Sequence, residues 1–478
     1  MGKSNSIKKQ ADPSRLTLRL RLILAIVIIA DILDLMDSNI TNIAAPSIVQ
    51  NIGGGESLIK WLGASYALAM GVLLVIGGRL GDRYGKRRLF LIGITGFTLA
   101  SGFCGLSANP SMLIAGRLIQ GGFGALLIPQ GMSILMSTFS REQFPRAVSA
   151  FGPVMSLSSV IGPILAGFII QANIGGLDWR PMFLINIVLG LAGIFAAVKL
   201  LPHDQPNSGE KLDGIGTALL GVSMLGLIFG LNEGSTDGWT ILPIASLITG
   251  AVMLVAFALR QRYADNPLIK PSLIKNKGFT SGLLVGLGFF AAVNGLAYVI
   301  SLFFQLVLHL TPYEAALGLC PMAIGIVISS MVCRPLLTKL GRTLIVIGLF
   351  AALIGALGLW LTVLIKGRAA TALLTAPAIL VIGAGMGACF SSIYEVALGD
   401  IEHDEAGSAS GSLSAVQQLS AAIGSAVVTT IFFNLQNTVG DVEAMKSSIL
   451  IVAAIVLICL GLVWLMPRSA PSEDLIEV

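Results

Sequence analysis

The chain has 478 residues, of which 55% are hydrophobic and 12% are charged, and its formal net charge is +5. Soluble proteins carry about 25% charged residues, so this composition excludes an ordinary water-soluble protein of this length and points to lipid as the solvent. The basic residues lie in short clusters between apolar stretches with few aromatic residues among them, which indicates signals of membrane topology and argues against a nucleic-acid partner.

Apolar stretches long enough to cross a bilayer follow one another along the whole chain. A transmembrane helix needs roughly 20 mostly apolar residues. The first stretch follows a basic tail but contains acidic residues and no small-residue cleavage pattern, so we expect a retained helix rather than a signal peptide. Fourteen stretches meet the requirement, namely residues 22–46, 58–79, 88–108, 111–137, 146–171, 181–201, 213–232, 240–259, 278–307, 313–338, 343–365, 371–398, 407–435 and 446–466. The sequence therefore predicts an all-α polytopic membrane protein with 14 transmembrane helices.

The lysines and arginines are distributed unevenly between the segments that these spans define. If the amino-terminus is inside, the inside segments carry 24 of them and the outside segments carry 5, while Arg117 lies within a span. Basic residues concentrate on the cytoplasmic side of membrane proteins, and one missed span would invert every later loop. We therefore expect both termini in the cytoplasm and the helices in a bacterial inner (plasma) membrane.

The loops and the cysteines give no indication of an enzyme or of a metal site. The longest polar stretches, residues 202–212 and 260–277, are too short for an attached soluble domain. The five cysteines lie in or beside apolar stretches and form no CxxC pair, which disfavours a disulfide framework or a zinc site. We expect a protein that is not an enzyme and that has no cofactor and no metal.

The first span carries an acidic face. Asp31, Asp34 and Asp37 are spaced three residues apart, and together with polar neighbours such as Asn42 they cover about 140° of the helical wheel. A charge at the centre of a membrane helix costs roughly 2.5–3.5 kcal/mol on insertion scales. This face is therefore expected to meet water or polar partners, and Asn42 is a candidate cavity residue.

Carboxylates at this spacing suit the coupling of transport to protons. In a poorly hydrated cavity they resist simultaneous ionisation, so the set holds a proton more readily. Each carboxylate could also balance a cationic substrate, and competition between a proton and a cation for one carboxylate would produce antiport. The alternative for any single aspartate is a hydrogen bond to a neighbouring helix.

Further polar residues interrupt later spans. Arg117, in the fourth span, could snorkel to the membrane surface, but Gln120 one turn further on favours a polar seam with a coupling or gating role, or else a structural ion pair. In the second half, Asn294 could line a cavity or form an interhelical hydrogen bond. Glu395 could be a functional acid or an interfacial acid beside Asp400.

A cluster of glycines and charges lies between the second and third spans. Residues 78–88 read GRLGDRYGKRR, which closely resembles the loop signature of the major facilitator superfamily. Glycines allow a tight turn, and Asp82 could pair with Arg83 or cap a neighbouring helix. Such a cluster could latch the cytoplasmic side shut, or it could determine topology alone. The candidate gate residues are Gly78, Asp82, Arg83, Gly85, Lys86 and Arg87.

Two further segments are similar to the drug:proton antiporter branch of that superfamily. Residues 113–125 match its fourth-span pattern, which contains a buried arginine. Gly162, Pro163 and Gly167 resemble the antiporter signature of its fifth span, with Ala166 in place of one glycine. Small residues there would permit close helix contact and a proline-dependent bend, although glycine and proline are common in membrane helices generally.

The first span is similar to the fourteen-helix drug:proton antiporter family in particular. Residues 37–46 match its D-x-x-x-x-N-x-A-x-P pattern, which implies that Asp37 takes the acidic position of that family. Residues 179–186 match a W-R-x-x-F-x-x-N element at the start of the sixth span. Asp31 and Asp34 are additions to the family pattern.

The resemblance implies a major facilitator fold of two six-helix bundles plus two inserted helices. The expected segments are a cytoplasmic tail (1–21), the amino-terminal bundle (22–202), inserted helices 7 and 8 (203–265), the carboxy-terminal bundle (266–466) and a second cytoplasmic tail (467–478).

The acidic face and the resemblance together predict a proton-coupled antiporter. It would export small amphipathic drugs or toxic compounds, lipophilic cations above all, by alternating access and as a functional monomer in the lipid bilayer. The alternative on the same fold is a dedicated exporter of one metabolite, antibiotic or siderophore. A channel or a receptor is a more distant alternative, and the short loops disfavour a receptor.

Overall fold

The structure is a computed structural model. It describes residues 16–467 except 141, 151–153, 155–157, 159–161, 163–164, 166–167, 171, 205–212, 334–335, 337–339, 400 and 403–404. Within these ranges the elements are all helical.

The first group of helices covers the amino-terminal part of the chain. Its members are α1 (Leu18–Ile52), α2 (Gly55–Tyr84), α3 (Lys86–Gly105), α4 (Pro110–Thr138), α5 (Phe144–Val148), the 3-10 turn η1 (Ile174–Gly176) and α7 (Pro181–Leu200). A middle set follows, made of α8 (Gly214–Asp237), α9 (Ile241–Tyr263) and the short α10 (Pro271–Lys275).

The second group covers the carboxy-terminal part. Its members are α11 (Lys277–Leu302), the π-helical turn η2 (Phe303–Val307), α12 (Pro312–Gly318), α13 (Cys320–Cys333), α15 (Arg342–Lys366), η4 (Gly367–Ala369), α16 (Ala372–Leu398), α17 (Ala406–Val439), α18 (Asp441–Leu462) and η5 (Val463–Leu465).

Twelve helices of the described part are long and apolar enough to cross a membrane, as judged by length and composition. They correspond to twelve of the predicted spans. The first predicted span falls on α1, a 35-residue helix that is outside this set of twelve and that carries the three aspartates. The fifth, residues 146–171, falls partly outside the described residues. The all-α membrane architecture is therefore confirmed, and the count of fourteen stays a prediction.

Short polar residues and glycines set the helix ends. The side chain of Asn109 accepts a hydrogen bond from the backbone of Met112, 2.9 Å away, and Pro110 takes the first position of α4. Gly85 adopts a φ of 98°, which separates α2 from α3. Such a sharp reversal brings α3 back alongside the helices that precede it.

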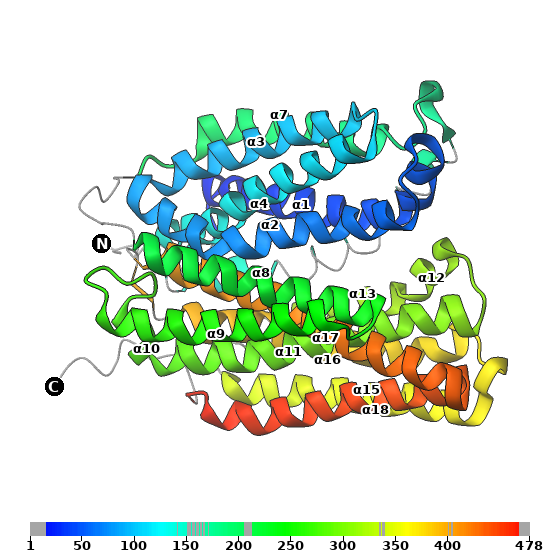
Figure 1. The fold of residues 1–478 in the computed structure, drawn as a ribbon. Coiled ribbons are helices and arrows are strands. Elements are labelled where there is room, and N and C mark those ends of the chain that lie inside the picture. The colour runs from blue at the N-terminus through cyan, green and yellow to red at the C-terminus, as the bar shows by residue number, and fades with distance from the viewer. Residues whose placement is uncertain are drawn as a thin grey trace, which may run out of the picture.

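The two groups of helices lie side by side, with α8 and α9 along their junction (Figure 1). Helix α17 of the second group packs against α2, α4 and α8, so it forms much of the interface. The start of α1 and the end of η5 lie at the same end of the bundle, at the left of Figure 1. Below, this end is called the Asp82 end.

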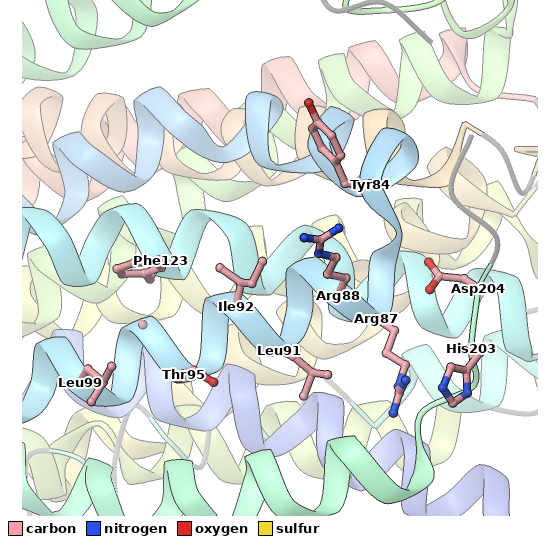
Figure 2. Close-up of a pocket in the computed structure, with 11 residues that line it drawn as sticks. Tyr84, Arg87, Arg88, Leu91, Ile92, Thr95, Leu99, Phe123, His203 and Asp204 are labelled. Atoms are coloured by element: carbon pink, nitrogen blue, oxygen red, sulfur yellow. The ribbon is translucent and has the colours of Figure 1, made fainter. Parts of the chain in front are cut away.

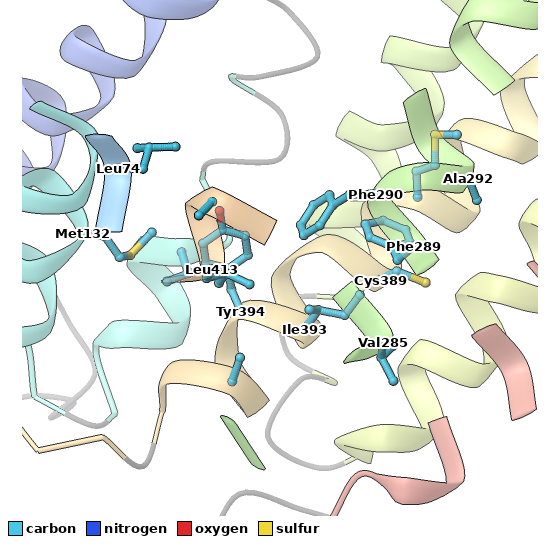
Figure 3. Close-up of a cluster of buried hydrophobic side chains, with 14 of the residues drawn as sticks. Leu74, Met132, Val285, Phe289, Phe290, Ala292, Cys389, Ile393, Tyr394 and Leu413 are labelled. Carbon is cyan, nitrogen blue, oxygen red and sulfur yellow. The ribbon is translucent and has the colours of Figure 1, made fainter. Parts of the chain in front are cut away.

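A layer of buried apolar side chains joins the two groups. Figure 3 shows Leu74 and Met132 of the first group beside Leu413 and Tyr394 of the second. All four belong to one continuous buried cluster. Burial of this surface holds the two groups together in the conformation seen here.

Candidate functional site

Asp37 lies at the centre of a buried polar network within the first group. Its carboxylate forms an ion pair with Arg117 of α4. The amide nitrogens of Gln120 and Asn186 donate hydrogen bonds to the Oδ1 atom of Asp37 over 2.9 and 2.7 Å. Gln120 also donates to the Ser101 hydroxyl, 2.8 Å away. Helices α1, α3, α4 and α7 therefore converge on one carboxylate.

Arg117 is fixed by contacts beyond its ion pair. Its Nε donates to the carbonyl oxygen of Leu62 over 3.1 Å, and its Nη1 donates to Gln120 Oε1 over 2.7 Å. Its guanidinium lies 4.4 Å from the centre of the Tyr66 ring. With 0% of the residue exposed, Arg117 does not snorkel to the membrane surface, and the predicted polar seam with Gln120 is present.

The stability of this buried arrangement depends on the charges of Asp37 and Arg117. Two opposite charges buried together are tolerable only when they are paired and their remaining hydrogen-bonding groups are satisfied. Protonation of Asp37 would remove the negative charge that is paired with Arg117, while Asp34 also lies within electrostatic reach of that guanidinium.

The other two aspartates of α1 are also buried, but they meet different partners. Asp34 accepts a hydrogen bond from the hydroxyl of Tyr66. Asp31 lies close enough to Tyr394 of α16 for the two to interact electrostatically, and the Tyr394 hydroxyl donates to Gln417, 2.9 Å away. The acidic face thus extends from the interior of the first group toward the second. The side chain of Asn42 lies outside what the structure describes.

Asp82 connects the two groups of helices. Its carboxylate accepts hydrogen bonds from the backbone nitrogens of Gly407 and Ser408, at 3.1 and 3.0 Å, in the first turn of α17. A carboxylate at that position is favoured by the unpaired N–H groups and the positive end of the helix dipole. Of the two arrangements considered from the sequence, the helix cap is therefore present, while the guanidinium of Arg83 lies over the Tyr84 ring at 5.0 Å.

The remaining gate residues have local contacts at the Asp82 end. Gly85 forms the turn, and the backbone nitrogen of Lys86 donates to the carboxylate of Asp204. Arg87 donates through its Nη2 atom to the carbonyl oxygen of Val198, 2.6 Å away, at the end of α7. These contacts fasten the α2–α3 turn to the segment that follows α7.

Gly78 allows α2 and α17 to approach closely, and this contact gives a stability prediction. A Cβ atom at Gly78 would overlap the carbonyl oxygen of Gly407, whereas at Gly102 the nearest atom to an added Cβ is Ile187 Cδ1, 3.4 Å away. Overpacking costs about 1–3 kcal/mol, so Gly78→Ala is expected to lower the melting temperature by several degrees. Gly102→Ala should be neutral or stabilising, because alanine favours a helix over glycine by up to about 1 kcal/mol.

The measurement is the thermal unfolding of both purified variants in detergent. Equal melting temperatures for Gly78→Ala and Gly102→Ala would show that the α2–α17 junction has spare room, which would contradict the close contact.

The other predicted site residues are dispersed. Gly162 is buried, while Pro163 and Gly167 lie outside the described residues. Asn294 is half-buried, and its amide donates to the carbonyl oxygen of Phe290 in its own helix over 2.8 Å, so this bond is intrahelical rather than interhelical. Glu395 is 8% exposed, and its backbone carbonyl oxygen accepts a hydrogen bond from the backbone nitrogen of Gly399, 2.7 Å away.

Sequence reasoning missed three members of the Asp37 network as polar partners. Asn186 belongs to the motif at residues 179–186, but that motif does not indicate which residue Asn186 contacts. Tyr66 was an aromatic among many, and Ser101 is a single small hydroxyl in an apolar helix with no signal of its own. No cluster of three or more potential metal ligands occurs in the part of the chain that the structure describes.

Comparisons with known proteins identify the family. The model of the Major Facilitator Superfamily matches residues 27–425. Over 417 residues the chain is 40% identical to the "Probable actinorhodin transporter" of Streptomyces coelicolor, covering 86% of this chain and 72% of that protein. Over 428 residues it is 30% identical to "Multidrug resistance protein 3" of Bacillus subtilis, covering 86% of this chain and 80% of that protein.

A solved structure agrees at the level of the fold. The crystal structure of the human organic anion transporter MFSD10 (TETRAN) aligns with a TM-score of 0.68 at 14% identity, covering 94% of this chain and 100% of that chain. The twelve candidate spans agree with this likeness to a solved membrane transporter. The protein belongs to the Major Facilitator Superfamily and is a multi-pass membrane transporter rather than an enzyme.

Proposed function

We propose that this transporter is a proton-coupled antiporter that exports small amphipathic compounds, lipophilic cations above all, across a bacterial plasma membrane. The observation that carries the proposal is the buried Asp37–Arg117 pair with its hydrogen bonds from Gln120 and Asn186. It supplies an ionisable group whose two protonation states would suit different helix arrangements. The name of the relative from Bacillus subtilis supports drug export.

The proposed orientation places the Asp82 end and both termini in the cytoplasm. The concentration of lysine and arginine in the corresponding loops supports it. Residues 22–202 and 266–466 would form two six-helix bundles that rock against each other, with α8 and α9 inserted between them. The functional unit would be the monomer.

In this mechanism the Asp82 end is closed in the conformation described here. Asp82 on the first turn of α17 and the Gly78–Gly407 contact support that assignment. A proton from the outside binds an aspartate of α1, weakens the retention of the cargo and favours the opposite opening. The proton then leaves toward the cytoplasm, and new cargo takes its place.

The proposal predicts that efflux depends on the pH gradient. In inverted membrane vesicles that contain the full chain, imposing an acidic interior should drive uptake of a lipophilic cation such as ethidium, and an exchanger that collapses the gradient should stop it. Vesicles in which only the electrical potential is collapsed provide the control. Uptake that continues unchanged without a pH gradient would refute proton coupling.

The second candidate is a dedicated exporter of one compound on the same fold. The relative that is named a probable actinorhodin transporter, at 40% identity, favours it. A substrate panel separates the two candidates: transport of several unrelated lipophilic cations supports drug export, and transport of one compound alone supports the dedicated exporter.

A further inference from the structure

A groove of about 780 Å³ lies on the outside of the first group, away from the Asp37 network. Its walls come from the end of α2, the first four turns of α3, Phe123 of α4 and the segment that follows α7 (Figure 2). The lining has two chemically distinct parts. Arg87, Arg88, His203 and Asp204 lie at the Asp82 end, and apolar side chains continue from there along α3.

The apolar part is a stripe on one face of α3. After Arg88 of the charged part, Ile92, Thr95 and Leu99 follow at helical spacing, and each of the four is exposed on the surface of the protein. At 1.5 Å per residue the rise along α3 from the charged part at Arg88 to Leu99 is about 16 Å, close to the roughly 15 Å of hydrocarbon in one leaflet of a bilayer. The phenyl ring of Phe123 packs against Gly96, so the floor of the groove is filled.

The charged part has spare capacity to bind an anion. Asp204 already receives the backbone N–H of Lys86 at the start of α3. Arg87 uses Nη2 on the carbonyl oxygen of Val198, but its buried Nε has no partner among the described residues. The side chain of Arg88 is exposed at the mouth of the groove. Two guanidinium groups thus lie around the mouth of an apolar groove, and Asp204, the acid beside them, already caps α3.

We propose that this groove binds an anionic phospholipid from the leaflet at the Asp82 end, with its headgroup phosphate at Arg87 and Arg88 and one acyl chain along α3. Guanidinium groups form strong, charge-assisted hydrogen bonds with phosphate oxygens. His203 adds an imidazole beside Arg87 that can form a further hydrogen bond. In the orientation proposed above, the lipid belongs to the cytoplasmic leaflet.

The combination of the two parts favours a lipid over the other occupants. A free phosphate would use only the basic mouth and would leave the apolar stripe without a partner. A lipophilic cation would meet the stripe but would be repelled by two guanidinium groups. A phospholipid with a net negative charge satisfies both parts at once, and its length matches the stripe.

The test measures lipid retention by native mass spectrometry on the full-length protein after delipidation in detergent. Dioleoylphosphatidylglycerol and dioleoylphosphatidylcholine, which share acyl chains, are added at equal concentration. The wild type is expected to retain the anionic lipid on the order of tenfold more than the zwitterionic lipid. Arg88→Gln should bring that ratio close to one, and Thr95→Trp, which fills the groove, should reduce retention of both.

Arg262→Gln is the matched control, because Arg262 is another exposed arginine at the same end of the bundle. It should leave the preference unchanged. Equal retention of the two lipids by the wild type would overturn the proposal, and so would an unchanged preference in Arg88→Gln. Displacement of the anionic lipid by glycerol phosphate or by tetraphenylphosphonium at equal concentration would instead assign the groove to a free anion or to a cationic cargo.

Discussion

Replacing Asp37 with asparagine is expected to abolish proton-driven export while the protein still inserts into the membrane. The substitution preserves side-chain shape but removes the charge opposite Arg117 and the site where a proton can bind and leave. Loss of one partner of a buried ion pair costs about 3–5 kcal/mol. Because asparagine at this position cannot bind and release a proton, we expect the initial rate of gradient-driven uptake into inverted vesicles, per molecule in the membrane, to fall to the background of vesicles without the protein.

A second variant separates lost coupling from lost stability. Asp37→Asn with Arg117→Gln removes both charges of the buried pair, so thermal stability lost in the single variant should return while transport stays absent. Asp265→Asn is the matched control, because Asp265 is an exposed aspartate in the loop between α9 and α10. It should leave both quantities unchanged. Wild-type transport by Asp37→Asn would remove Asp37 from the mechanism.

The helices were predictable because lipid imposes a simple requirement on sequence. Each span must bury its backbone polar groups in a helix of sufficient length and apolarity, so α3, α4 and α15 lie close to the ranges predicted from hydropathy alone. The prediction ended the seventh span at residue 232, but α8 continues to Asp237. Polar residues there ended the apolar stretch without ending the helix, because the end of a membrane helix can extend into water.

The site was predictable only where burial itself carries an energetic penalty. Asp37 and Arg117 stand out in their apolar spans, because a charged side chain within the membrane is costly and is found there only with a partner or a function. Asn186 and Ser101 are cheap to bury, so their sequence positions carry little information, and only the packing of α7 and α3 against α1 and α4 brings them to Asp37. A network assembled from four helices depends on tertiary packing, which helical periodicity does not specify.

Covalent closure of the junction between α4 and α17 should stop transport completely and reversibly. The hydroxyl oxygens of Ser133 and Ser410 lie 3.4 Å apart across the two groups, which brings cysteines at both positions within reach of a disulfide. Alternating access requires this junction to separate in every cycle. With the five native cysteines replaced by alanine, oxidation of Ser133→Cys/Ser410→Cys is expected to reduce uptake to the fraction of molecules that remain uncrosslinked, and a reductant should restore it.

The geometry also provides a matched pair in which no bond should form. Ser412 lies two residues further along α17 than Ser410, about 200° around the helix, and its hydroxyl donates to the carbonyl oxygen of Ser408, 2.7 Å away, so Ser133→Cys/Ser412→Cys should keep free thiols and full transport after oxidation. Maleimide labelling measures the remaining thiols in both pairs. A rigid link at Ser410 cannot coexist with an opening at the Asp82 end. Complete crosslinking with unchanged transport would therefore mean that cargo and protons pass without separation of α4 from α17. In that case the rocking mechanism would have to be abandoned.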